Sequence, residues 1–156
     1  MPLEIGKEAP DFTLFNDERE KVSLHSFRGH NVVLNFFPAA FTSVCTAQLC
    51  DARDNMKAYE KLDAKILGIS IDTAFALKKY KADNNYEFPL LSDYNKTVIR
   101  EYGLVLKDFI LGMHDVSKRA VVVIDKSGIV QHLEITASPS DMPDLKKVRD
   151  VLQMIG

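Results

Sequence analysis

Three residues in the first third of the chain have the types and the spacing expected of a reactive thiol site. Cys45 follows Thr42 by three positions and Pro38 by seven. A thiolate is a strong nucleophile, and the Thr42 hydroxyl can reach a thiolate or an oxygen bound beside it. Pro38 has a fixed φ and no backbone N–H, so it can shield a pocket without adding a competing donor. This combination predicts nucleophilic chemistry at Cys45.

Each of these residues also has a plainer explanation when it is judged alone. Pro38 could simply end a strand, and Thr42 could simply cap a helix. Cys45 shares a helical face with Leu49 and Ala52, so it could be an inert core cysteine. The elements around the three residues therefore decide between a structural and a chemical role.

A strand followed by a helix is predicted to position the thiol. Residues 32–37 form an apolar run rich in β-branched and aromatic side chains, which is typical of a buried strand. Apolar residues at helical spacing follow, which predicts a helix from about Thr42 to Leu62. Cys45 then lies in the first turn of that helix, at the carboxyl end of the strand. Unpaired backbone N–H groups give this position a partial positive charge, which stabilises a thiolate.

The rest of the chain predicts further strands and helices around this unit. Near-continuous apolar character in residues 64–72 is typical of a central parallel strand covered on both faces. The other expected elements are an N-terminal hairpin (11–15 and 21–24), a helix at 74–82 anchored by Phe75, Leu77 and Tyr80, a marginal strand at 88–91, a helix at 97–102, a hairpin (119–124 and 129–135) and a last helix capped by Ser140. This order predicts an α/β, thioredoxin-like fold with helices flanking a central mixed sheet, in a single domain over residues 1–156.

Composition narrows the classes of function. The chain has 156 residues, of which 46% are hydrophobic and 27% charged, as expected for one globular domain with a complete core. A net charge of −2 results from 20 Lys and Arg against 22 Asp and Glu. Because no long basic tract is present, we expect no nucleic-acid partner. No apolar run approaches the roughly 20 residues that cross a bilayer, so we expect no membrane partner either.

The N-terminus and the cysteine content indicate a reducing compartment. The sequence begins without a basic segment and an apolar core, so we expect no secretory signal and a cytoplasmic location. Two cysteines in such a chain argue against a disulfide scaffold and for a catalytic or metal-binding pair. They make only half of a tetrahedral metal site, and the 4 histidines are scattered along the chain. No metal or other cofactor is therefore predicted.

The pattern Pro38-x-x-x-Thr42-x-x-Cys45 resembles the P-x-x-x-T/S-x-x-C active-site motif of the peroxiredoxins, which are thiol peroxidases of thioredoxin-like fold. The stretches that resemble the same family, in the same order, are 6–14, 69–72, 88–93 and 119–128. The resemblance covers roughly residues 6–135, so it spans the domain. The family has an arginine where the late hairpin begins, and Arg119 occupies that position.

The resemblance implies that Cys45 reduces peroxides without a cofactor. An ordinary thiol has a pKa of about 8.5 and is only about 3% ionised at pH 7. The helix N-terminus and Arg119 are both expected to favour the thiolate. As the O–O bond breaks, Arg119, Thr42 and nearby backbone N–H groups would stabilise the leaving oxygen, and a sulfenic acid would remain on Cys45. The alternative for Arg119 is an unpaired surface charge at the end of a strand.

Cys50 is the candidate for a second, resolving thiol. The segment from Cys45 to Cys50 resembles the Q-type (bacterioferritin-comigratory) branch, which resolves from five positions downstream, and it has Gln48 where many relatives carry Glu. Residues five apart on an intact helix have Cα atoms roughly 8–9 Å apart, whereas disulfides rarely exceed about 7 Å. A Cys45–Cys50 disulfide therefore requires the start of the helix to unwind. Residues 36–41 also resemble the one-cysteine branch, so resolution by an external thiol stays open.

The implied partners are peroxide substrates and a reductant, which is thioredoxin, glutaredoxin or a small thiol. The chain can be a monomer or a homodimer. A thiol–disulfide oxidoreductase is disfavoured because the sequence has no C-x-x-C motif. A redox sensor or an oxidation-triggered chaperone on the same scaffold stays an alternative. Peroxide turnover distinguishes them, because a sensor would oxidise once and stop.

Overall fold

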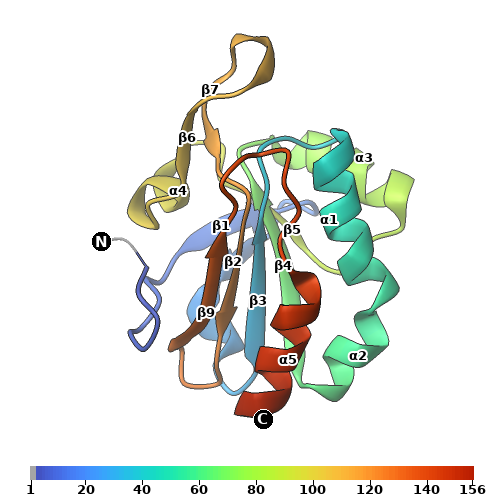
Figure 1. Cartoon of the computed structure of the whole chain (residues 1–156). Coiled ribbons are helices and arrows are strands. Elements are labelled where there is room, and N and C mark those ends of the chain that lie inside the picture. Colours follow the sequence, from blue (N-terminus) through green and yellow to red (C-terminus); the bar gives the residue numbers. More distant parts are fainter. Residues whose placement is uncertain (1–2) are drawn as a thin grey trace.

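A seven-stranded mixed sheet lies at the centre of the computed structural model, which describes residues 3–156 (Figure 1). Its strand order is β2-β1-β5-β4-β3-β8-β9. The strands are β1 (Thr13–Asn16), β2 (Lys21–Ser23), β3 (Asn31–Phe36), β4 (Ala64–Ser70), β5 (Leu90–Ser92), β8 (Ala120–Ile124) and β9 (Val130–Ile135). The three strands β3, β4 and β5 are parallel, and all other neighbours in the sheet are antiparallel. The predicted central mixed sheet and N-terminal hairpin are therefore confirmed.

The register of β3 brings two distant parts of the chain to one end of the sheet. Phe36, the last residue of β3, lies opposite Ile69 of β4 on one side. On the other side it lies opposite Ala120, the first residue of β8. The chain that leaves β3 toward Cys45 and the chain that enters β8 through Arg119 are therefore neighbours.

Helices and the N-terminal segment cover the two faces of the sheet. The helices are α1 (Ser43–Asp54), α2 (Met56–Lys61), α3 (Ala74–Asn84), α4 (Thr97–Glu101), α5 (Leu145–Ile155) and a 3-10 turn, η1 (Leu24–Phe27). On one face, Leu49 of α1, Leu77 of α3 and Val148 of α5 belong to the same buried cluster. On the other face, Ile99 of α4 and Phe12 belong to a second cluster. No helix within residues 3–156 has the length and apolar character needed to span a bilayer.

The helix predicted from Thr42 to Leu62 is in fact two helices that are separated at Asn55. The Asn55 backbone leaves the helical region, with φ −113° and ψ 18°. Its side-chain amide donates a hydrogen bond to the Asp51 carbonyl at 2.7 Å. Asparagine competes in this way with the backbone and so disfavours helix interiors. The prediction of one continuous helix was wrong for this reason.

The predicted cap of the last helix and the predicted anchor Phe75 of α3 were also wrong. The N-cap residue of α5 is Asp144 and not the predicted Ser140. The Asp144 carboxylate accepts a hydrogen bond from the Lys147 N–H at 3.1 Å. Pro143 disfavours helical geometry in the residue before it, so the helix begins after this proline.

Phe75 does not anchor α3, because its side chain is 71% exposed. Leu77 and Tyr80 are fully buried, as predicted. Residues two apart lie about 200° apart around a helix, so Phe75 cannot share the buried face of Leu77.

A second, two-stranded sheet projects from the body of the molecule (Figure 1). It consists of β6 (Val105–Asp108) and β7 (His114–Ser117), which are joined through the 3-10 turn η2 (Ile110–Gly112). The sequence predicted no element here. Within these strands only residues 116 and 117 are buried, so the apolar pattern that marks the other strands is missing.

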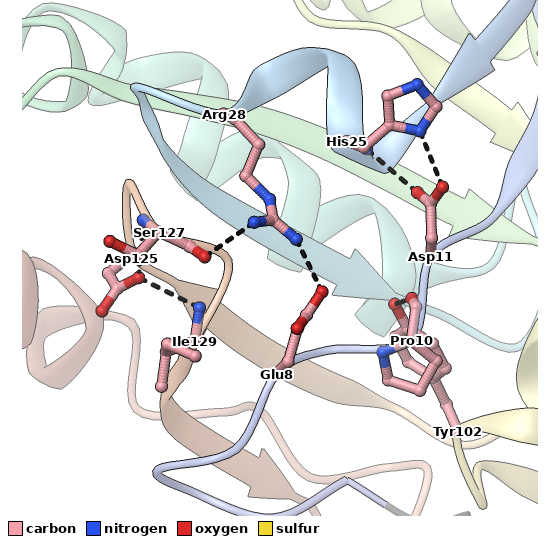
Figure 2. Close-up of polar contacts among 9 residues, drawn as sticks. All are labelled: Glu8, Pro10, Asp11, His25, Arg28, Tyr102, Asp125, Ser127 and Ile129. Atoms are coloured by element: carbon pink, nitrogen blue, oxygen red, sulfur yellow. Dashed lines mark hydrogen bonds and ion pairs between the residues drawn. The ribbon is translucent and has the colours of Figure 1, made fainter.

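Polar contacts tie the N-terminal segment to the end of the sheet that lies opposite the Cys45 end (Figure 2). Arg28 donates hydrogen bonds to Glu8 at 2.9 Å and to the Ser127 carbonyl at 2.8 Å. Gly128 in the same turn has a φ of +85°, and a Cβ at this position would lie 2.4 Å from the Arg28 guanidinium. The backbone conformation therefore favours glycine here, and a Cβ would also displace the end of the Arg28 side chain.

Candidate active site

Cys45 is the third residue of α1, so it lies in the first turn of the helix, as the sequence predicted. Its side chain is completely buried, in a cluster that includes Val33, Leu49 and Val121. The unpaired N–H groups of the first turn place partial positive charge near the thiol. Val44, its neighbour in the chain, is partly exposed.

Asp72, which follows β4, fixes the loop between β3 and α1. Its carboxylate accepts the Ala40 N–H at 2.8 Å and the Ser70 hydroxyl at 2.6 Å. Pro38 is buried within this loop. Phe41 has a φ of +68°, a conformation that costs a non-glycine residue about 1–3 kcal/mol. The loop therefore has a defined and locally strained shape where it enters the helix.

Thr42 is the N-cap residue of α1, with an extended backbone. Its hydroxyl does not cap the helix and donates instead to the Ala39 carbonyl at 2.8 Å. A hydroxyl has one hydrogen and two lone pairs, so the Thr42 oxygen remains available as an acceptor. It can accept a hydrogen bond from a bound group that carries an O–H.

Arg119 directly precedes β8 and is buried, with 2% of its surface exposed. Its Nε and Nη2 donate to the Pro139 carbonyl at 2.9 and 2.7 Å. Its Nη1 donates to the side-chain oxygen of Gln48 at 3.0 Å. Gln48 in turn donates to the Asn35 side chain of β3 at 3.1 Å. The hydrogen-bond partners of Arg119 among the described residues are thus neutral oxygens, and the buried positive charge has no carboxylate bonded to it.

The contact between Arg119 and Gln48 brings the guanidinium to the helix that carries Cys45. Gln48 follows Cys45 by three positions on α1, and residues at this spacing lie on one side of a helix. Within residues 3–156, no direct hydrogen bond joins Arg119 to Cys45 or Thr42. The structure therefore brings Arg119 and Cys45 together through Gln48. The alternative of an exposed charge at the end of a strand is excluded by the burial of Arg119.

Cys50 lies two turns into α1 and is partly exposed. Both cysteines are free thiols on one uninterrupted helix, the arrangement that a direct disulfide cannot bridge. The Cys50 sulfur lies 3.7 Å from the hydroxyl of Tyr86, which comes from the segment between α3 and β5. The catalytic roles of Pro38, Thr42, Cys45, Cys50 and Arg119 stay predictions.

Three residues that shape this site were not predicted from the sequence. Asp72 holds the loop, Pro139 provides the carbonyl for Arg119, and Tyr86 contacts Cys50. Each contact joins residues that are far apart in the chain, so no local spacing marks it. One signal could have indicated Asp72, because polar residues that follow a central parallel strand gather at the edge where sites form.

The chemistry available here is that of a thiol next to fixed hydrogen-bonding groups. Among residues 3–156, no cluster of three or more His, Cys, Asp or Glu side chains could hold a metal ion. The groups on or bound to the first turns of α1 are a thiol, a hydroxyl acceptor and a guanidinium. Together they suit attack by sulfur on a bond whose leaving atom gains negative charge.

Comparison with known proteins points to the same chemistry. Residues 5–133 match the AhpC/TSA family. Alkyl hydroperoxide reductase E from Mycobacterium tuberculosis is 33% identical over 153 residues, which cover 96% of each chain. Peroxiredoxin Bcp from Escherichia coli is 35% identical over 133 residues, which cover 85% of each chain.

Solved structures agree with the sequence relatives. The crystal structure of peroxidoxin BcpB from Mycobacterium tuberculosis matches this chain with a TM-score of 0.87 and 29% identity, over 99% of both chains. This likeness confirms the predicted thioredoxin-like α/β fold.

Proposed function

Because the chain belongs to the AhpC/TSA family, we propose that it reduces peroxides by attack of the Cys45 thiolate on the O–O bond. The protein is a peroxiredoxin, that is, a thiol-dependent peroxidase. One observation carries the choice of Cys45: it lies in the first turn of α1, one turn before the residue that binds a buried guanidinium. The proposed site consists of Pro38, Thr42, Cys45 and Arg119.

In the first step, the sulfur of Cys45 attacks the peroxide oxygen that carries the hydrogen. An S–O bond forms while the O–O bond breaks, and the other oxygen leaves as an alkoxide or hydroxide. This oxygen takes up a proton and departs as an alcohol or as water. Cys45 becomes a sulfenic acid, so its sulfur loses the two electrons that the peroxide gains.

In this proposal, two side chains assist the step. A guanidinium has five N–H groups, and three hydrogen bonds to Gln48 and Pro139 leave two N–H groups of Arg119 for the oxygens of the substrate. Thr42 accepts the hydrogen of the peroxide, because its own hydrogen is bound to Ala39. Pro38 lies buried in the loop between β3 and α1, where it shields the site without adding a donor.

In the second step, Cys50 attacks the sulfenic acid of Cys45. The S–S bond forms, the S–O bond breaks, and the hydroxide takes up the proton of Cys50 to leave as water. Because both residues lie on the intact helix α1, its first turns must unwind for the two sulfur atoms to meet. Thioredoxin or a similar thiol donor then reduces the disulfide, as a reducing compartment such as the cytoplasm permits.

Peroxide consumption by the wild type, Cys45→Ser and Cys50→Ser tests this proposal, with a reductase system present and absent. Cys45→Ser should lose turnover, because a serine hydroxyl does not ionise near neutral pH. Cys50→Ser should reduce one equivalent at the wild-type rate and then accumulate sulfenic acid. Residual turnover by Cys45→Ser would show that the nucleophile is another group.

Mass spectrometry of the wild type after one equivalent of peroxide tests the resolving step. A Cys45–Cys50 disulfide is the expected product. If Cys50 stays a free thiol while Cys45 carries a sulfenic acid or an external thiol, the protein is a one-cysteine peroxidase.

A further inference from the structure

Two buried tyrosines cover one side of α1 and contact it between the two cysteines. Tyr80 belongs to α3, and Tyr86 lies between α3 and β5. The two rings meet edge to face, with their centroids 5.4 Å apart. Their side chains are 0% and 3% exposed. We refer to Tyr80 and Tyr86 as the tyrosine pair; neither takes part in the chemical steps described above.

The Tyr86 hydroxyl contacts α1 at two points. It lies 3.7 Å from the Cys50 sulfur and 3.4 Å from the Thr46 carbonyl oxygen. A carbonyl can only accept, so Tyr86 donates its hydrogen to Thr46 and accepts the S–H of Cys50. The Thr46 carbonyl is also the α-helical acceptor for the N–H of Cys50. Tyr86 therefore holds the Cys50 thiol and the preceding helical turn at the same time.

Tyr80 contacts the same turn and the loop before it. Its hydroxyl lies 3.0 Å from the Thr46 hydroxyl. Its ring packs against Phe41 and Phe37, with centroids 5.0 and 6.0 Å away. Burial raises the pKa of both Tyr80 and Tyr86, so both phenols keep their hydrogens. The tyrosine pair thus joins the first two turns of α1 to α3 and to the segment after it through neutral hydroxyl groups.

The last turn of α1 is held in a different way. Arg149 of α5 forms an ion pair with Asp51 at 2.9 Å. Arg53 donates to the Asn84 carbonyl at the end of α3, also at 2.9 Å. Charge-assisted hydrogen bonds of this kind are about twice as strong as neutral ones. The end of α1 is thus held by charged groups, whereas the tyrosine pair holds residues 46–50 through neutral ones.

We propose that Tyr86, supported by Tyr80, is a positioning residue for the resolving step, because it controls how readily residues 43–50 unwind to bring Cys50 to Cys45. This inference rests on the proposed function of Cys50. When Cys50 loses its proton, the Tyr86 hydrogen turns from the Thr46 carbonyl to the anionic sulfur. The turn between the cysteines then loses one of its contacts at the moment when Cys50 becomes a nucleophile.

Amide hydrogen exchange in the reduced protein provides the first test, because no disulfide chemistry is involved. Tyr86→Phe keeps the ring and removes only the hydroxyl. Exchange within residues 43–50 should become roughly three- to tenfold faster, as expected for the loss of about one hydrogen bond. Tyr80→Phe should change the same residues in the same direction. Unchanged exchange in residues 43–50 of Tyr86→Phe would overturn the proposal.

Tyr102→Phe is the matched control for this test. Tyr102 is also a buried tyrosine whose hydroxyl binds a backbone carbonyl, that of Pro10, but it lies in the cluster on the other face of the sheet (Figure 2). Its loss should leave exchange in residues 43–50 unchanged. Exchange in α5 should be unaffected in Tyr86→Phe and in Tyr102→Phe, because the contacts made by these two hydroxyl groups do not involve this helix.

The second test measures the resolving step itself. After one equivalent of hydrogen peroxide, the ratio of the rate of disulfide formation to the rate of the first oxidation should rise roughly three- to tenfold in Tyr86→Phe. At high peroxide this variant should form less sulfinic acid on Cys45, because its sulfenic acid is consumed sooner. A loss of global stability that leaves residues 43–50 as protected as in the wild type would not change this ratio in favour of the disulfide.

The outcomes separate the proposal from the function on which it rests. If the wild type forms the disulfide and Tyr86→Phe forms it at the same rate or more slowly, the positioning role of Tyr86 is wrong and the role of Cys50 stands. If the wild type forms no intramolecular disulfide, the role of Cys50 is wrong, and the role of Tyr86 fails with it.

Discussion

Two arginines hold opposite ends of the central sheet, and their surroundings differ in charge and in burial. Arg28 is exposed and binds Glu8 and the Ser127 carbonyl, as Figure 2 shows. Arg119 is buried and binds the Pro139 carbonyl together with Gln48. Each guanidinium is bound by one backbone carbonyl and one side chain, but only Arg28 has a carboxylate.

This difference separates a structural contact from a functional one. An exposed ion pair is worth about 0–1 kcal/mol and costs little desolvation. A buried charge with neutral partners is costly, so it contributes little to stability on balance. The same charge can stabilise an anion that forms beside it, because the surroundings contain no bound carboxylate to offset it. Arg119 therefore suits chemistry, whereas Arg28 suits attachment of the N-terminal segment.

Replacing each arginine with methionine tests this comparison, and the largest effect is expected on the rate of the first reaction with peroxide. Arg119→Met should slow the first reaction with peroxide by about 100-fold, because fixed charged donors are lost. Arg28→Met should leave this rate unchanged and lower the free energy of unfolding by less than about 1 kcal/mol. Stopped-flow oxidation of Cys45 and urea denaturation measure the two quantities. Equal rates in the two variants would remove Arg119 from the proposed site.

Removing the side chain that binds Arg119 to α1 should have an intermediate effect. Gln48→Leu leaves one N–H of Arg119 and the Asn35 side chain without their partner, at a cost of about 1–3 kcal/mol in unfolding free energy. The first peroxide reaction should slow by about tenfold, since Arg119 loses its contact with the helix of Cys45. Gln131→Leu is the control, because Gln131 binds Asp125 at the Arg28 end of the sheet. A wild-type rate in Gln48→Leu would show that this contact does not position Arg119.

A change at the Arg28 end should affect stability and spare the chemistry. Gly128→Ala introduces a Cβ next to the Arg28 guanidinium at a residue with a φ of +85°. The unfolding free energy should fall by about 1–2 kcal/mol, since alanine is strained in this conformation. Urea denaturation measures the loss, and stopped flow should show an unchanged rate of Cys45 oxidation. A slower rate would mean that the two ends of the sheet are coupled.

The smallest expected effect depends on pH. At the Arg28 end, a hydrogen bond from His30 and, to a lesser extent, the charge of Lys126 hold the pKa of Asp63 below its ordinary value of 3.8, against the opposing effect of burial. Because the folded pKa is the lower one, the contribution of Asp63 is complete above about pH 4 and is lost as the pH falls through the folded pKa. The difference in unfolding free energy between the wild type and Asp63→Asn should be present at pH 5–6 and should shrink as the pH falls below the ordinary pKa of 3.8. A difference that grows on acidification would contradict this assignment.

The sequence predicted those parts of the fold that depend on local patterns. The buried strands β3 and β4 and the hairpin of β8 and β9 were located to within about two residues, because long apolar runs mark them. The break at Asn55 and the late start of α5 were missed. Both depend on how one side chain or one proline competes with the helical hydrogen bonds, which apolar periodicity does not reveal.

The candidate site likewise contains residues that their spacing in the sequence indicated and residues that no local pattern indicated. Pro38, Thr42 and Cys45 lie close together in the chain, so their spacing alone indicated a reactive thiol. Arg119 was found only through the resemblance to a family. Pro139 contributes a backbone carbonyl, which any residue carries, so its side chain gives no signal. The two contacts of Tyr86 on α1 exist only because the fold brings the segment after α3 beside the helix, and no spacing in the sequence encodes them.

The tyrosine pair also gives the protein an optical property. The chain has 5 tyrosines and no tryptophan, so tyrosine is its dominant near-ultraviolet fluorophore. The Tyr86 hydroxyl lies against the Cys50 sulfur. The ring centroids of Tyr80 and Tyr86 are 5.4 Å apart. Thiols quench tyrosine fluorescence at contact, and nearby rings exchange excitation energy. Separation of Cys50 from Tyr86 therefore alters the emission of the unlabelled protein, which becomes an intrinsic reporter of the state of its own thiols.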